Sequence, residues 1–208
     1  MKKSMCITYI VENNLYVNIT NKCSNNCDFC IRNNGDGAYG SDSLWLEREP
    51  TTEEILTSIL SHDLLKYKEI VFCGYGEPSY RLDDAVSIAK KIKERFPKIK
   101  IRINTNGQSD LILKRSTAKD YYPAFDTVSI SLNAPTAEEY DRICHSRFGS
   151  SAFTAILDFA KEVKNYVPDT AFSVVREFLS AEELEKCKEL SRNNGIALKI
   201  RDYIPPTT

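Results

Sequence analysis

Hydrophobic residues follow two alternating patterns along this chain. Short runs rich in β-branched and aromatic residues, typical of strands, occur at residues 15–19, 69–73, 100–104, 127–131, 171–175 and 196–200. Between these runs, apolar residues recur at intervals of three and four, as over residues 82–96 and 153–166, which indicates helices. Regular alternation of strands and helices predicts an α/β fold built on a parallel sheet.

Local signals place the ends of several elements. Three capping boxes predict helix starts, at Thr51 to Glu54, Thr136 to Glu139 and Ser180 to Glu183, and Gly195 is expected to cap the last helix. A shorter helix is expected near residues 110–119. At the amino end, runs 6–11 and 15–19 flank the segment 12–14, which predicts a hairpin whose first strand lies at the sheet edge.

Six strand and helix units are expected from residue 15 onward. A closed (β/α)8 barrel typically takes about 250 residues, whereas this chain has 208. We therefore predict a partial (open) TIM barrel, with a (β/α)6 core and an N-terminal β-hairpin strand. A single domain is expected over residues 1–208.

Composition narrows the classes of function. The formal net charge of −1 gives no electrostatic argument for a nucleic-acid partner. No apolar stretch reaches the roughly 18 residues that a membrane span takes, so no membrane partner is expected. Seven cysteines, an odd number, without a signal-peptide pattern indicate the reducing cytoplasm and argue against a disulfide framework.

The strongest chemical signal is a cysteine-rich loop directly after the run at residues 15–19. Cys23, Cys27 and Cys30 follow the spacing C-x3-C-x2-C. A [4Fe–4S] cluster is normally held by four cysteines, so three leave one iron open to another ligand. A zinc knuckle is the main alternative, but structural zinc takes four ligands and no fourth cysteine or histidine lies nearby in the sequence.

This spacing, with Phe29 just before the third cysteine, resembles the signature of the radical S-adenosylmethionine (SAM) superfamily. The resemblance implies a [4Fe–4S] cluster on the three cysteines, with SAM chelating the open iron. It implies reductive cleavage of SAM to a 5′-deoxyadenosyl radical, which abstracts hydrogen from an unidentified substrate. A small reducing protein of the flavodoxin or ferredoxin type is then expected as electron donor.

The end of the second of these strands carries a further part of the resemblance. Gly74, Tyr75, Gly76, Glu77 and Pro78 are similar to the GGE motif of the superfamily, with Tyr75 at the second glycine. In that motif the backbone and a carboxylate contact the SAM ammonium. Close-approach glycines and a glutamate suit this task physically.

Two later strands also end in runs that resemble superfamily motifs. Asn104 and Asn106 belong to an Asn-Thr-Asn-Gly run that is similar to the TNG run beside SAM. Ser129, Ser131 and Asn133 belong to a run similar to SLDA, whose serine faces the SAM carboxylate or ribose. Because alternate strand residues share a face, these last three side chains are expected to point into the barrel.

The segment after the capping box at Thr136 supplies candidates for substrate contact or hydrogen-atom return. Cys144, His145 and Arg147 leave the carboxyl end of a strand and are expected to lie across the barrel mouth, although a solvated helix end would show the same pattern. The loop 33–50 is expected to cover a lateral opening. The alternative is an ordinary surface loop that packs on Trp45.

Further features resemble one group within the superfamily, but this narrower resemblance does not indicate which reaction is catalysed. The small size, the Cys-Ile-Arg after the motif and the Arg-Asp-Tyr-Ile that begins at Arg201 resemble the TatD-family-linked radical SAM proteins. Two other reactions of the class stay open, one like that of 7-carboxy-7-deazaguanine synthase and one that activates a glycyl-radical partner. A non-catalytic metal-binding protein that kept the fold is the alternative from another class, and it predicts no SAM cleavage.

Overall fold

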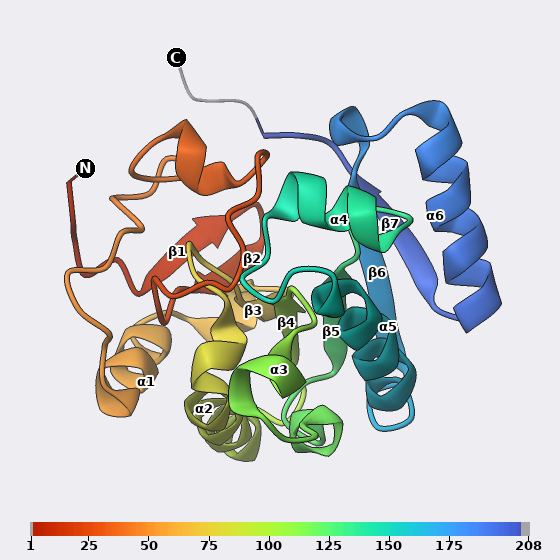
Figure 1. Cartoon of the computed structure of the whole chain (residues 1–208). Coiled ribbons are helices and arrows are strands. Elements are labelled where there is room, and N and C mark those ends of the chain that lie inside the picture. Colours follow the sequence, from red (N-terminus) through yellow and green to blue (C-terminus); the bar gives the residue numbers. More distant parts are fainter. Residues whose placement is uncertain (1, 205–208) are drawn as a thin grey trace.

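The computed structural model describes residues 2–204, so residues 1 and 205–208 of the expected domain lie outside it. Its centre is a seven-stranded sheet whose strands follow chain order (Figure 1). The hairpin strand β1 (Thr8–Val11) runs antiparallel to β2 (Asn14–Val17), and all later neighbours are parallel. The later strands are β3 (Glu69–Phe72), β4 (Lys100–Thr105), β5 (Thr127–Ser131), β6 (Asp169–Val175) and β7 (Ala197–Arg201).

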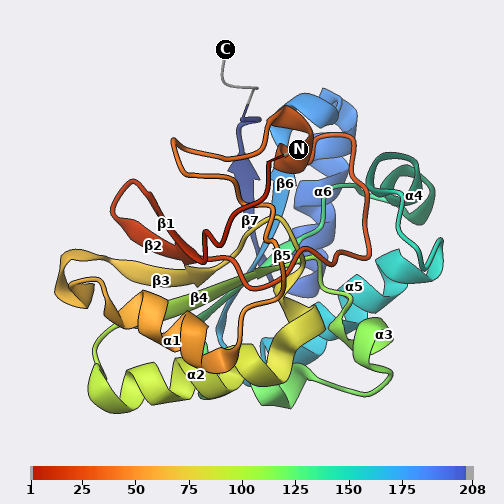
Figure 2. The same cartoon turned by 90° about the vertical axis from the view of Figure 1, so that its left-hand side faces the viewer.

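Helices connect the parallel strands. They are α1 (Thr52–Leu60), α2 (Leu82–Arg95), α3 (Ser109–Leu113), α4 (Ala137–Cys144), α5 (Ser151–Val163) and α6 (Ala181–Asn194). In both views α1 and α2 lie on one side of the strands, and the red to orange segment that follows β2 lies on the other (Figures 1 and 2). Between residues 2 and 204, no helix combines the length and apolar character needed to cross a membrane.

The topology confirms the predicted partial barrel. Strands β2 to β7 are the six parallel strands of a (β/α)6 core, and β1 extends the sheet beside β2. Within residues 2–204, β1 and β7 are the two edges of the sheet and do not pair with each other. The barrel is therefore open between these two strands.

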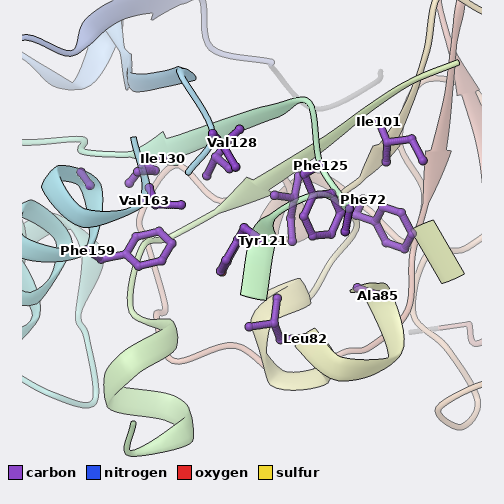
Figure 3. Packing of buried hydrophobic residues seen from close by; sticks show 14 of the residues in the cluster. Phe72, Leu82, Ala85, Ile101, Tyr121, Phe125, Val128, Ile130, Phe159 and Val163 are labelled. Atoms are coloured by element: carbon purple, nitrogen blue, oxygen red, sulfur yellow. The ribbon is translucent and has the colours of Figure 1, made fainter. Parts of the chain in front are cut away.

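The main core lies between the sheet and the helices. Alternate strand residues such as Ile101 and Ile103 are fully buried on this side. An aromatic row continues the packing, with ring centroids 5.7 Å apart for Phe72 and Phe125, 5.7 Å for Tyr121 and Phe125, and 5.2 Å for Tyr121 and Phe159 (Figure 3). The strands are thereby held so that their other face forms the barrel interior.

The barrel interior is polar. Arg102 of β4 lies two residues before Asn104, on the strand face opposite to Ile101 and Ile103. Its guanidinium pairs with the Glu69 carboxylate at 2.8 Å. Arg102 is thus neutralised by a carboxylate from the neighbouring strand.

The structure shortens several predicted elements. The helix expected near residues 110–119 ends at Leu113, because Lys114 adopts a left-handed conformation with φ of 55°. A 3-10 helix, η4 (Ala118–Tyr121), follows it. The first strand begins at Thr8, two residues later than expected from the run at 6–11, because the Cys6 N–H is bound by a serine hydroxyl and does not enter the ladder.

The loop 33–50 packs against Tyr75 at the end of β3, and its role as a cover over the lateral opening stays a prediction. The Tyr75 hydroxyl donates to the Gly35 and Gly37 carbonyls at 2.9 and 3.0 Å. The Trp45 ring meets the Tyr75 ring edge-on, with centroids 5.2 Å apart. Tyr39 at the loop tip remains 49% exposed. The tyrosine at the second motif glycine therefore anchors this loop.

Replacing Phe159 by alanine tests whether the aromatic row holds the sheet. Deletion of a buried phenylalanine leaves a cavity, so Phe159→Ala should lower the free energy of unfolding by about 3–5 kcal/mol. The exposed Leu65, at 85% exposure, provides the control, and Leu65→Ala should change it by less than about 0.5 kcal/mol. Urea unfolding followed by circular dichroism measures both, and equal midpoints for the two variants would contradict the packing.

Candidate functional site

A cavity of about 220 Å³ lies at the carboxyl ends of the parallel strands. It brings together most of the residues that the sequence motifs predicted. Its lining residues include Cys23, Cys27, Phe29, Cys30, Gly74, Tyr75, Gly76, Glu77, Asn104, Asn106 and Ser131. Segments far apart in the sequence thus meet at one site.

The cysteine loop is held by the end of α4. The Asn26 N–H donates to the Cys144 carbonyl and the Asp28 N–H to the Ile143 carbonyl, each at 3.0 Å. Helix carbonyls at a C-terminus lack partners within the helix. The two N–H groups of the loop are the missing partners, and these hydrogen bonds fix the backbone of the loop.

A buried network of side-chain hydrogen bonds holds the cysteine loop through Asn25. The Gln108 amide donates from Nε2 to Asn25 Oδ1 and to the Tyr140 hydroxyl, both at 2.9 Å. Asn25 Nδ2 also donates to this hydroxyl at 2.8 Å. The Ser146 hydroxyl donates to Gln108 Oε1 at 3.1 Å. Sequence reasoning missed Gln108 and Tyr140, because their link to Asn25 exists only through space.

Two of the three sulfurs receive hydrogen bonds from the chain. Arg32 Nε donates to Cys30 Sγ at 3.2 Å, and the Asn25 N–H donates to Cys23 Sγ at 3.4 Å. Arg32 is further positioned by a bond from its Nη2 to the Asn25 carbonyl at 3.1 Å. Donors at sulfur stabilise negative charge there, as cluster ligation needs.

Two of the three thiols have a raised pKa. Burial raises the pKa of Cys23 to about 12. Contact with the Cys144 thiol, followed by burial, raises the pKa of Cys27. A metal ligand must be a thiolate, so metal binding would release these protons. Deprotonation of Cys23 and Cys27 would thus accompany metal binding.

Three cysteine sulfurs line the cavity. In a cubane cluster each cysteine binds a different iron, so three cysteines leave one iron open to another ligand. A structural zinc site takes four protein ligands, and the cysteine loop contributes three.

Close packing explains the two motif glycines. A Cβ on Gly76 would lie 2.2 Å from the Thr20 carbonyl oxygen, which is backbone and cannot move aside. A Cβ on Gly74 would lie 2.1 Å from Asn18 Oδ1. The missing side chains let the motif lie against the segment that leads into the cysteine loop.

Glu77 is 4% exposed and accepts three hydrogen bonds from the chain. Its Oε1 accepts from the Ser79 N–H at 3.0 Å and from the Thr105 hydroxyl at 2.8 Å. Its Oε2 accepts from the Asn106 N–H at 2.6 Å. Burial raises the pKa of Glu77, and these donors oppose the rise. A carboxylate has about four acceptor positions, so one remains on Oε2 for a ligand.

Of the remaining predicted contacts, Asn104 and Ser131 are available to a ligand, whereas Asn106 and Ser129 are hydrogen-bonded within the chain. Asn104 lines the cavity, and its Oδ1 is buried without a hydrogen-bond partner in the described chain. Asn106 also lines the cavity, but its Nδ2 donates to the Ser24 hydroxyl at 2.7 Å and so holds the cysteine loop. Ser131 lines the cavity, whereas Ser129 does not and accepts a hydrogen bond from Arg201 at 2.8 Å.

The three candidates at and just after the end of α4 lie beside the cysteine loop and do not line the cavity. Cys144 is fully buried and accepts from the Asn133 amide at 3.6 Å. The His145 ring binds Asp28 Oδ1 at 2.8 Å, and Arg147 donates to the Tyr80 hydroxyl at 3.2 Å. Their position at the carboxyl end is as predicted. Each side chain already has a hydrogen-bond partner in the chain, and a role of the three in substrate contact or hydrogen-atom return stays a prediction.

Substitution of Glu77 tests whether its three hydrogen bonds stabilise the fold. Glu77→Gln places an amide nitrogen where one of three donors now points, so it should lower the free energy of unfolding by about 1.5–3 kcal/mol in metal-free protein. Thermal or urea unfolding measures this. Glu47→Gln, at an exposed position, is the control and should have little effect. Unchanged stability of Glu77→Gln would mean that the three bonds do not hold the motif in place.

Comparison with known proteins agrees with this site. The sequence model of the Radical SAM superfamily matches residues 17–190. Molybdenum cofactor biosynthesis protein 1 of Drosophila melanogaster is 27% identical over 191 residues, which cover 92% of this chain and 32% of that protein. The probable GTP 3′,8-cyclase of Thermococcus kodakarensis is 26% identical over 194 residues, which cover 93% of this chain and 57% of that protein.

A solved structure shows the same fold. Streptococcus suis SuiB bound to S-adenosylmethionine has a TM-score of 0.69 and 20% identity to this chain, covering 94% of it and 41% of SuiB. The chain thus spans less than two thirds of the length of these proteins. Because the superfamily match nevertheless extends over most of the chain and includes the cysteine loop, the chain belongs to the radical SAM superfamily.

Proposed function

We propose that this protein is a radical SAM enzyme that acts on an unidentified substrate. One observation carries the proposal: three cysteines and the residues of the SAM-binding motifs line a single cavity at the mouth of an open barrel. The three sulfurs would hold a [4Fe–4S] cluster. When bound, the cluster supplies the electron that cleaves SAM and so produces the radical that abstracts hydrogen.

The residues of the chain would bind and orient SAM. The free acceptor position on Glu77 Oε2 and the unpartnered Asn104 Oδ1 suit donors such as an ammonium group or ribose hydroxyls. A buried polar atom without a partner costs free energy, which a bound donor would recover. Ser131 offers a hydroxyl on the same cavity wall.

Other parts of the function follow from the class. An electron donor of the flavodoxin or ferredoxin type would reduce the cluster, and we propose that one radical SAM domain spans residues 1–208. All seven cysteines are free thiols, which supports a reducing compartment such as the cytoplasm. The resemblance to the TatD-linked group stays a prediction, as do the deazaguanine-synthase-like and glycyl-radical-activating alternatives.

The non-catalytic alternative is less well supported. A protein that kept only the fold has no need of donors to two cysteine sulfurs or of an open acceptor position on a buried carboxylate. Anaerobic reconstitution should give about four irons per chain and an absorbance that bleaches with dithionite. The reduced protein should then convert SAM to 5′-deoxyadenosine, measured by liquid chromatography. A fully loaded, reducible protein that never cleaves SAM would favour the non-catalytic alternative.

The three ligands can be tested by single substitutions. Alanine at Cys23, Cys27 or Cys30 should abolish cluster binding, since the loop has no spare thiol. Cys73→Ala and Cys187→Ala are controls that should load normally. Iron content and absorbance after reconstitution measure both sets. Loss of iron from the control variants alone would show that the ligands lie elsewhere.

Arg32 should influence the reduction potential of the cluster. Its charge and its bond to Cys30 Sγ favour the reduced, more negative state, so Arg32→Gln should lower the midpoint potential. Arg32→Lys keeps the charge, so its midpoint potential should lie between those of the wild-type protein and Arg32→Gln. A redox titration followed by electron paramagnetic resonance measures the potential. Arg48→Gln, at an exposed ion pair with Glu54, is the control, and an Arg32→Gln potential equal to it would refute the assignment.

A further inference from the structure

Arg201 supplies positive charge to the cavity. It is the last residue of β7 and pairs with Val175 of β6 in the sheet register. Its Nη2 donates to the buried Ser129 hydroxyl at 2.8 Å, which fixes the guanidinium inside the barrel. Among the cavity's lining residues it is the sole lysine, arginine or histidine.

The Arg201 guanidinium lacks a counter-ion within the described chain. Across residues 2–204, no carboxylate approaches Arg201 within ion-pairing distance, while Arg102 pairs with Glu69 at 2.8 Å and Arg176 with Asp202 at 3.5 Å. Arg201 is partly buried, so water screens its charge less than that of a fully exposed arginine. An anionic ligand group beside it would therefore be attracted more strongly than at an open surface.

The carboxylate of SAM is poorly placed to be this group. Glu77 follows β3 and Arg201 ends β7, so four strand spacings of about 4.8 Å each separate their strands along the curved sheet. The ammonium and carboxylate of SAM sit on one carbon atom. If the ammonium binds at Glu77, as proposed above, the carboxylate on the same carbon atom lies on the β3 side of the cavity, whereas Arg201 lines its β7 side.

The open side of the barrel offers a route to Arg201. Strand β7 is an edge of the sheet, and Lys199 lies two residues before Arg201 on the same strand face. Lys199 is exposed and, among residues 2–204, has no carboxylate partner within ion-pairing distance. A second positive charge thus lies on this edge and would attract an anion toward the opening.

We propose that Arg201 forms a subsite for a carboxylate or phosphate group of the second substrate, the molecule from which hydrogen is abstracted. Lys199 assists the entry of this group from the open edge. The inference rests on the proposed function, because it assumes that SAM occupies the side of the cavity near Glu77. It narrows the substrate to molecules with an acidic group at one end.

Chemical modification of arginine tests the subsite. Protein with a reconstituted cluster is treated anaerobically with phenylglyoxal, alone or with SAM, inorganic phosphate or acetate, and the modified peptides are quantified by mass spectrometry. Phosphate or acetate should slow the modification of Arg201, and the more effective anion identifies the group. SAM alone should not slow it. Arg176, already paired with Asp202, is the internal control and should respond to neither anion.

Binding measurements on variants complete the test. Calorimetric titration of phosphate or acetate into the SAM-loaded protein should show affinity about tenfold weaker for Arg201→Gln, with partial retention in Arg201→Lys and no change in Arg176→Gln. Protection of Arg201 by SAM alone, or equal anion affinity in all variants, would overturn the subsite. Failure to load iron or bind SAM would instead count against the proposed function, since iron content and SAM affinity are measured first.

Discussion

Residues 23–30, which contain the three cysteines, form neither helix nor strand, so the shape of this loop depends on hydrogen bonds to other parts of the chain. The backbone N–H groups of Asn26 and Asp28 bind the last carbonyls of α4. The Asn25 side chain joins Tyr140 and Gln108, which lie 115 and 83 residues away in the sequence. Buried polar groups must find such partners or lose stability. The spacing of the sulfurs is therefore set by the completed barrel.

The SAM-binding motifs share this dependence. Asn106 donates its N–H to Glu77 and its side-chain amide to Ser24 of the cysteine loop. One residue thus connects the end of β4 to both the carboxylate after β3 and the loop after β2. A change that moves any of these strand ends would move the other two. Residues that resemble ligand contacts also act as structural supports, which is why their loss would affect both folding and binding.

The cavity is chemically asymmetric. On the β3 side, Glu77 is surrounded by donors and keeps one acceptor position. On the β7 side, Arg201 is held by Ser129 and has no carboxylate partner in the described chain. Tyr75 fixes the loop 33–50 beside the first of these regions. This asymmetry is the basis of the proposal that SAM binds on the β3 side and a second, acidic ligand on the β7 side.

Sequence alone determined the order of strands and helices and identified the three cysteines that line the cavity. Hydrophobic periodicity and capping boxes are local, so the helices that begin after Thr51 and Ser180 and the six parallel strands could be predicted. The cysteine spacing is also local. Only the tertiary structure decided that Ser129 binds Arg201 and that His145 binds Asp28. These contacts depend on strand register and on where a helix end meets a loop, and no short stretch of sequence contains both partners.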